Sequence, residues 1–169
     1  MKLEEAKQQF TQSWGVLAGQ WGINRTMAQI HALLLVSGSP KSTDDIMEEL
    51  SVSRGNVNMN IRELMDWGLV DKVILQGDRK EYFSAEKDIW KVSTRILSQR
   101  KKRELDPMLK TLSQIKNIEG DKRNNAEVKA LMETVKSIEK FAGQIEKTLD
   151  TIIKAEENWF WGNFIKILK

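Results

Sequence analysis

Cysteine is absent from this 169-residue chain, and His31 is its only histidine. The lack of thiols excludes disulfides, zinc–thiolate sites, iron–sulfur clusters and cysteine nucleophiles. No stretch approaches the roughly 18 apolar residues of a membrane-spanning helix, and the opening MKLEEAKQQF lacks the apolar core of a signal peptide. We therefore expect a cytoplasmic protein with no membrane partner.

Motifs for chemistry are equally scarce. The sequence has no nucleophile elbow, phosphate-binding loop, metal-ligand set or suggestive carboxylate pair. His31 lies in an apolar segment without a partner motif, which predicts a buried or boundary histidine. These absences predict a protein that is not an enzyme and uses no cofactor.

The overall composition is that of a folded, helix-rich protein, with two prolines, 40% hydrophobic residues and 30% charged residues. A formal net charge of +3 permits nucleic-acid binding but does not argue for it. The position of each charge therefore matters more than the total.

Hydrophobic periodicity predicts helices separated by one β-hairpin. The predicted helices cover residues 3–20, 26–37, 42–51, 53–67, 86–116 and 126–156, with hairpin strands at 69–75 and 80–85 and a polar loop at 117–125. Thr26 and Thr43 are the expected N-caps of the second and third helices, Ser53 caps the fourth, and Gly68 ends it. Pro107 either kinks the long helix or marks a local helix start.

This order of elements is that of a winged helix-turn-helix, in which a helix, a turn and a second helix precede a hairpin. The expected fold is mainly α with a small β-hairpin (α+β), flanked by long N- and C-terminal dimerisation helices. The predicted divisions are an N-terminal dimerisation helix (1–25), a DNA-binding domain (26–85) and a long-helix dimerisation region with an aromatic C-terminal helix (86–169).

The stretch SRGNVNMNIREL, residues 53–64, combines poor helix formers with a helical spacing of Val57, Ile61 and Leu64. We expect these three, with Met65, to dock the helix on the domain. The outward and flanking residues suit groove reading, because asparagine bonds adenine edges, arginine bonds guanine edges and methionine contacts thymine methyls. They are Gly55, Asn56, Asn58, Met59 and Arg62. The alternative is an ordinary surface helix of weak sequence.

Phosphate contacts are expected beside this helix. Its N-terminus offers Arg54 and free N–H groups, and the hydroxyls of Ser42, Thr43 and Ser53 are predicted to help position phosphates.

The hairpin tip QGDRK, residues 76–80, is the predicted wing. Arg79 and Lys80 can reach a minor groove or phosphates, with Asp78 orienting Arg79 through a short salt bridge. A charged tip is also common on ordinary surfaces, so this reading depends on the neighbouring helix-turn-helix.

Other features concern the long helices. Basic residues concentrate at RKKR, 100–103, either as a solvated face, as phosphate contacts or as a balance for acidic neighbours in the dimer. A heptad seam predicts dimerisation, with an intramolecular hairpin against 86–116 as the alternative. Its residues are Leu131, Val135, Ile138, Ala142, Ile145, Leu149 and Ile152.

The six tryptophans are expected to serve core and interface packing, with an aromatic cage for a quaternary ammonium ligand as the alternative. The closing segment NWFWGNFIKILK is expected to dock on the dimer rather than lie on a membrane.

Four stretches resemble the GbsR-type branch of the MarR superfamily of winged helix-turn-helix transcriptional regulators. They are WGINRTMAQIHALLLVS, TDDIMEELSVSRGNVNMNIRELMDWGLV, GDRKEYF and RKKRELDPMLKTL, within about residues 14–112. The resemblance implies a homodimer, often a repressor, with a recognition helix at Ser53–Trp67 and a wing at Lys72–Phe83. Some relatives respond to choline and control glycine betaine synthesis or uptake, which makes a small-molecule effector such as choline or betaine a further expected partner.

The sequence therefore predicts a homodimeric, sequence-specific regulator of transcription that reads a pseudo-palindromic operator in double-stranded DNA. The recognition helix 53–67 would enter the major groove, and the wing 76–80 would lie at the minor groove. The alternative is a helical protein-interaction module that retains the winged-helix fold.

Overall fold

The computed structural model of this chain describes residues 1–20, 22–116 and 126–155, and it divides into two compact units, Met1–Val92 and Ser93–Lys169. Trp21, the predicted loop 117–125 and the aromatic segment with Trp159 and Trp161 lie outside the described residues. Within the described ranges, no helix is long and apolar enough to cross a membrane.

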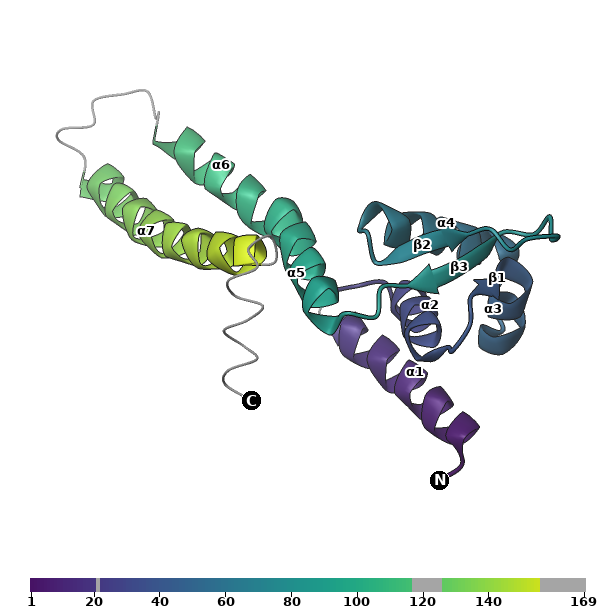
Figure 1. Cartoon of the computed structure of the whole chain (residues 1–169). Coiled ribbons are helices and arrows are strands. Elements are labelled where there is room, and N and C mark those ends of the chain that lie inside the picture. The colour runs from purple at the N-terminus through teal and green to yellow at the C-terminus, as the bar shows by residue number, and fades with distance from the viewer. Residues whose placement is uncertain (21, 117–125, 156–169) are drawn as a thin grey trace, which may run out of the picture. The chain divides into compact units, whose positions relative to one another are not determined.

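The first unit is a winged helix-turn-helix preceded by an extra helix (Figure 1). Its elements are α1 (Leu3–Gln20), α2 (Arg25–Val36), β1 (Lys41–Ser42), α3 (Thr43–Leu50), α4 (Arg54–Asp66), β2 (Val70–Val73) and β3 (Tyr82–Ala85). Residues Ile30, Ile46, Val57 and Leu64 are at most 1% exposed and form its core. The predicted fold class is confirmed.

The sheet is small and antiparallel, in the order β1-β3-β2. Val70 pairs with Ala85 and Val73 with Tyr82, which confirms the predicted hairpin with shorter strands. Strand β1 was not predicted. Its two residues form a strand only because Lys41 and Ser42 pair with Phe83 and Tyr82, and a pairing partner so far along the chain leaves no local periodicity.

Two predicted helix caps are wrong by one or two residues. Asn24, not Thr26, caps α2 by accepting from the Met27 N–H at 3.1 Å. Ser42, not Thr43, caps α3, where it forms a reciprocal capping box with Asp45. In both cases an adjacent polar side chain reaches the free N–H groups better. The Ser53 cap of α4 and the terminating Gly68, with φ 70°, are confirmed.

Helix α1 buries its small residues and leaves its large apolar residues exposed. Thr11, Gly15 and Ala18 are buried, whereas Leu3 is 69% and Val16 49% exposed. A Cβ at Gly15 would lie 2.6 Å from Cγ of Gln29, so glycine permits the close approach of α1 to α2. The exposed apolar side faces away from this contact.

The second unit breaks the predicted helix 86–116 into three pieces. They are α5 (Ile89–Arg100), which begins within the first unit, a π-helical turn η1 (Lys101–Leu105) and α6 (Asp106–Ile115). The Asp106 N–H donates to the Lys101 carbonyl five residues back. Pro107 follows at once, lacks an N–H and would crowd the preceding turn of an ordinary α-helix. The predicted local helix start at Pro107 is therefore confirmed.

Helix α7 (Ala126–Ala155) packs against η1 and α6. Val135 is 3% exposed and Ala142 is fully buried, while the Lys101 ammonium lies 3.3 Å from Glu146 and 3.4 Å from Asp150. Part of the predicted heptad seam is thus used within the chain.

A buried histidine and a lysine meet at the end of α2. His31 is 2% exposed, and its Nε2 has no hydrogen-bond partner. The Lys87 ammonium donates to the carbonyls of Leu34 and Leu35, both at 2.7 Å, and of Ser37 at 2.9 Å, which caps the helix C-terminus. Burial, and then the charge of Lys87, lowers the pKa of His31 from 6.5 to about 4.

We expect the first unit to lose stability as the pH falls from 6.5 towards 4. In this window the unfolded chain binds a proton at His31 that the folded chain does not, so the folded state loses up to about 3 kcal/mol. Chemical unfolding of the wild type and of His31→Leu at each pH measures the loss. The variant should lack this slope, and equal slopes in both proteins would contradict the assignment to His31.

Candidate nucleic-acid interface

Helix α4 presents its predicted reading face to solvent. Arg54, Gly55, Asn58 and Arg62 are exposed, and Met59 is 58% exposed. The opposite side docks through Val57, Asn60, Ile61 and Leu64, which are all buried. Met65 was predicted on that docking side but is 39% exposed, because it lies about 80° around the helix from Val57.

Two asparagines of α4 are hydrogen-bonded to each other. The buried Asn60 side chain donates from Nδ2 to the Asn56 carbonyl at 2.8 Å and to Asn56 Oδ1 at 2.6 Å. Asn56, predicted to flank the reading face, is half-buried. Helical spacing places the two residues one turn apart, but only the structure shows that their amides meet.

Asp44, in the first turn of α3, connects the recognition helix and the wing. Its carboxylate pairs with the Arg54 guanidinium and lies 3.6 Å from the Lys80 ammonium. This role of Asp44 was not predicted, because an acidic side chain at a helix N-terminus is expected for the helix dipole alone. Exposed ion pairs of this kind stabilise weakly, so the chief effect is to orient two cations beside each other.

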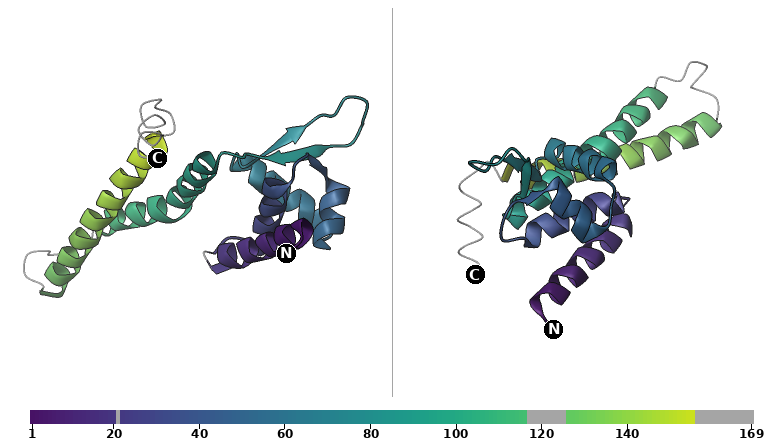
Figure 2. Two further views of the ribbon diagram at one scale, coloured as in Figure 1. Left: turned by 60° about the horizontal axis from the view of Figure 1, so that its bottom comes forward. Right: turned by 90° about the vertical axis from the view of Figure 1, so that its right-hand side faces the viewer.

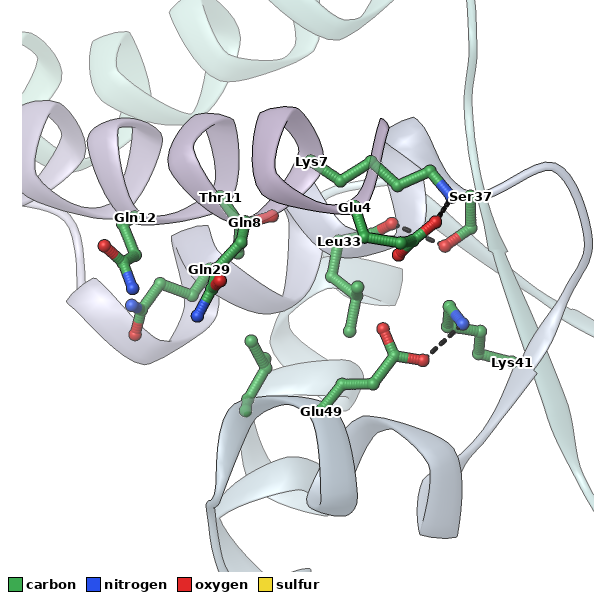
Figure 3. A pocket seen from close by; sticks show the side chains of 11 residues that line it. Glu4, Lys7, Gln8, Thr11, Gln12, Gln29, Leu33, Ser37, Lys41 and Glu49 are labelled. Carbon is green, nitrogen blue, oxygen red and sulfur yellow. Dashed lines mark hydrogen bonds and ion pairs between the residues drawn. The ribbon is translucent and has the colours of Figure 1, made fainter. Parts of the chain in front are cut away.

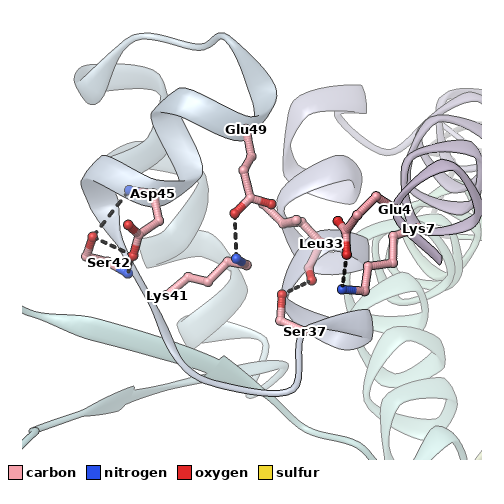
Figure 4. A network of polar contacts seen from close by, with 8 residues as sticks. All are labelled: Glu4, Lys7, Leu33, Ser37, Lys41, Ser42, Asp45 and Glu49. Atoms are coloured by element: carbon pink, nitrogen blue, oxygen red, sulfur yellow. Dashed lines mark hydrogen bonds and ion pairs between the residues drawn. The ribbon is translucent and has the colours of Figure 1, made fainter. Parts of the chain in front are cut away.

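Ser42 does not face solvent as a phosphate contact requires. It is 3% exposed, and its hydroxyl donates to Asp45 Oδ2 at 2.8 Å and accepts from the Asp45 N–H at 3.2 Å (Figure 4). Hydrogen bonds from the Ser42 backbone N–H and hydroxyl lower the pKa of Asp45. Ser42 is therefore a structural cap, while Thr43 and Ser53 remain half-buried and exposed at the starts of α3 and α4.

The wing projects beyond the helices as an exposed loop between β2 and β3 (Figure 2). Gly77 at φ 86° makes its turn, and Arg79 and Lys80 are exposed. Asp78 does not form the predicted salt bridge with Arg79. Its carboxylate instead accepts from the Lys80 N–H at 2.9 Å and from the Tyr82 hydroxyl at 2.7 Å. These two bonds stabilise the backbone of the turn that carries Arg79.

A separate pocket of about 520 Å³ lies between α1, α2 and the start of the helix-turn-helix (Figure 3). Its lining holds two ion pairs, Lys7–Glu4 at 2.8 Å and Lys41–Glu49 at 2.5 Å. The remaining lining residues are all uncharged and none is aromatic: Gln8, Thr11, Gln12, Gln29, Leu33, Ser37 and Leu50. The pocket therefore does not provide the aromatic cage considered from the tryptophan content.

The first two residues of the basic run 100–103 pair with acidic side chains of the second unit. Arg100 pairs with Glu104 at 3.1 Å, and Lys101 lies 3.4 Å from Asp106. One predicted alternative was a balance for acidic neighbours in the dimer, whereas these acidic partners belong to the same chain. Among the described residues, no cluster of histidine, aspartate and glutamate side chains could hold a metal ion.

Comparison with known proteins points in the same direction as this geometry. The sequence model of the MarR family matches residues 21–81. The HTH-type transcriptional repressor GbsR of Bacillus subtilis (strain 168) is 26% identical over 103 residues, which are 61% of this chain and 57% of that protein. The putative HTH-type transcriptional regulator YvaV of the same organism is 20% identical over 96 residues, or 57% of this chain and 54% of that protein.

The chain thus spans about half the length of the curated relatives it matches. A crystal structure of a transcriptional regulator is similar in fold, with a TM-score of 0.66 and 15% identity over 90% of this chain and 99% of that one. At this identity the likeness supports the fold alone.

The bond between Asp78 and Tyr82 predicts a spectroscopic signal from the wing. Tyr82 is the only tyrosine of the chain, and its pKa is raised chiefly because its hydroxyl donates to Asp78. We expect Asp78→Asn to lower this pKa towards the ordinary value of about 10, as measured by tyrosinate absorbance during alkaline titration. Asp71→Asn, on the neighbouring strand, is the matched control and should leave the titration unchanged. An unaltered midpoint of the tyrosinate titration in Asp78→Asn would contradict the hydrogen bond between Tyr82 and Asp78.

Proposed function

We propose that this chain, whose residues 21–81 match the sequence model of the MarR family, is a homodimeric DNA-binding regulator that represses transcription. The observation that carries the proposal is the exposed face of α4, which presents Arg54, Asn58, Met59 and Arg62. At the start of this face Arg54 shares the Asp44 carboxylate with Lys80 of the wing. In helix-turn-helix proteins the N-terminal residues of this helix contact base edges in the major groove. A face of amides and guanidinium groups suits that role.

In this proposal Arg62 and Asn58 read bases, and Gly55 allows a close approach to the sugar–phosphate backbone. The free N–H groups at the start of α4, with Ser53 and Arg54, favour a phosphate there. Thr43 lies at the corresponding end of α3. Arg79 and Lys80 of the wing would contact the minor groove or its phosphates.

Dimerisation is supported by an unpartnered apolar stripe on α7. Leu131, Ile138 and Ile145 recur every seventh residue and are 44%, 42% and 37% exposed, with Phe141 between them at 64%. This stripe adjoins the buried positions Val135 and Ala142, so the predicted seam has one side packed within the chain and one side open. A second subunit would cover the open side and match a two-fold DNA site.

A small-molecule effector would act by favouring one separation of the two recognition helices, whose half-sites lie about 34–36 Å apart on DNA. The pocket between α1 and α3 adjoins the first helix of the helix-turn-helix. Its polar, aromatic-free lining gives no support to choline or betaine as the ligand at that place.

The test is fluorescence anisotropy with the DNA upstream of the protein's own gene and a shuffled duplex of equal composition, at several salt concentrations. An affinity excess of roughly a thousandfold for the native duplex is expected of a specific regulator. Weak binding that is equal for both duplexes would mean charge attraction alone, and the remaining genomic fragments would then be screened. No binding at low salt would favour the protein-interaction alternative.

Two arginine variants separate base reading from phosphate binding. Arg62→Ala should cost roughly 1–3 kcal/mol on the preferred duplex and little on the shuffled one. Arg79→Ala should weaken binding to both and lower the salt slope by about one. Lys136→Ala on α7 is the control for loss of a positive charge. Equal losses on every duplex would make Arg62 a phosphate contact, and an unchanged slope would exclude Arg79 from the DNA.

Phe141→Glu tests the dimer. A charge on the open apolar stripe should convert dimer to monomer at micromolar concentration, because burial of an unpaired carboxylate is costly. Sedimentation equilibrium measures the mass, and circular dichroism checks that α7 stays helical. Lys136→Glu, at an exposed position of the same helix, should remain dimeric. A dimeric Phe141→Glu protein would place the subunit contact elsewhere.

A further inference from the structure

Asn60 is a buried amide on the docking side of α4. It is 1% exposed and lies beside the buried side chains of Val57, Ile61 and Leu64. An amide in such surroundings is costly unless it is hydrogen-bonded. Asn60 makes its bonds to one residue only, because both of its Nδ2 contacts, at 2.8 and 2.6 Å, are to oxygens of Asn56.

The chemistry of these contacts fixes which way each amide points. The backbone carbonyl of Asn56 can only accept, so the part of Asn60 that faces it must be the NH2 group. The atom of the Asn56 side chain that faces the same NH2 group must then be its oxygen. Reversal of either amide would bring two donors or two acceptors together, so both orientations are determined.

This arrangement leaves Asn56 as a donor on its outer side. Its Oδ1 is turned inward to Asn60, and its backbone N–H is taken by Ser53 Oγ at 3.4 Å. Its own side-chain NH2 group makes no hydrogen bond within the described structure. The half-buried Asn56 thus offers two N–H donors from the first turn of α4.

A freely turning asparagine bonds adenine at two atoms, by donating to N7 and accepting from the N6 amino group. The second of these bonds needs Asn56 Oδ1, which already accepts from Asn60 and is held in the orientation that this bond sets. Donation by the turned amide remains available to N7 of adenine, to N7 and O6 of guanine and to O4 of thymine, whereas the N4 amino group of cytosine presents a donor to a donor. Adenine offers the turned amide one acceptor beside a donor, whereas guanine offers two acceptors, so the pair disfavours adenine relative to an unrestrained asparagine.

We propose that Asn60 is a positioning residue for DNA recognition, which turns the Asn56 amide so that α4 selects guanine or thymine rather than adenine at one base position. The inference rests on the proposed function and adds a rule of base choice to it. Asn60 itself does not contact DNA. It acts through the orientation of its neighbour.

The experiment begins with selection of bound duplexes from a pool of random sequence. The position whose base preference disappears in Asn56→Ala is the one that Asn56 reads. The wild type should prefer guanine or thymine there, and replacement of that guanine by 7-deazaguanine should weaken binding because an acceptor is removed. A wild-type preference for adenine at that position would overturn the proposal.

Asn60→Leu removes the restraint with a side chain of similar size. We expect the affinity ratio of adenine to guanine at that position to rise roughly tenfold, the value of one regained bidentate contact. Asp66→Ala removes an exposed polar side chain at the far end of the same helix, outside the proposed reading face, and should leave this ratio unchanged. An unchanged ratio in folded Asn60→Leu would also overturn the proposal, and the wild-type base series decides the matter if that variant does not fold.

A measurement on the free protein separates this inference from the proposed function. In NMR spectra the Asn60 side-chain NH2 should exchange slowly with solvent and show coupling across its hydrogen bonds to Asn56, while the Asn56 NH2 should exchange rapidly. The opposite pattern would refute the orientation even if DNA binding is specific. Absence of specific binding with the expected NMR pattern would refute the proposed function, and the base rule with it.

Discussion

The docking of α4 through Val57, Ile61 and Leu64 is the constraint on which the interface depends. These side chains are at most 3% exposed. The helix has little stability of its own, because Gly55, Asn56, Asn58 and Asn60 are poor helix formers. Tertiary packing and the Ser53 cap supply the helix stability that the residue propensities do not. The outward residues therefore need not stabilise the helix and can be residues suited to contact with a ligand.

Acidic side chains then arrange the cations around that helix. Asp44 holds Arg54 and Lys80 close together, although they come from α4 and from the wing. Asp78 acts on the backbone of the wing rather than on a cation. A polyanion that approached this surface would compete with Asp44 for both positive groups. The Asp44 carboxylate thus neutralises part of the positive charge of the candidate interface in the free protein.

Much of the fold follows from the sequence, because hydrophobic periodicity extends over whole helices and Gly68 and Ser53 mark ends by local chemistry. The sequence does not predict β1, the Asp44 contacts or the Asn56–Asn60 bonds, since each depends on where distant or neighbouring atoms meet in three dimensions. Spacing alone predicted the exposed residues of α4 except Met65, which was expected on the docking side. Their individual roles were not predictable, as the buried Ser42 and the turned amide of Asn56 illustrate.

The π-turn η1 has a consequence for how this part of the chain tolerates change in length. Its bonds span five residues instead of four, so it holds one residue more than an ordinary helical turn. Loss of one residue there would restore an ordinary helical turn, and the residues that follow would keep the helix faces that they now occupy. Loss of one residue from the ordinary α-helical part of α5 or α6 would instead rotate the following residues by about 100°, and the buried Leu112 would leave its contact if it lay after the deletion. Single-residue deletions in η1 should therefore be better tolerated than deletions elsewhere in these helices.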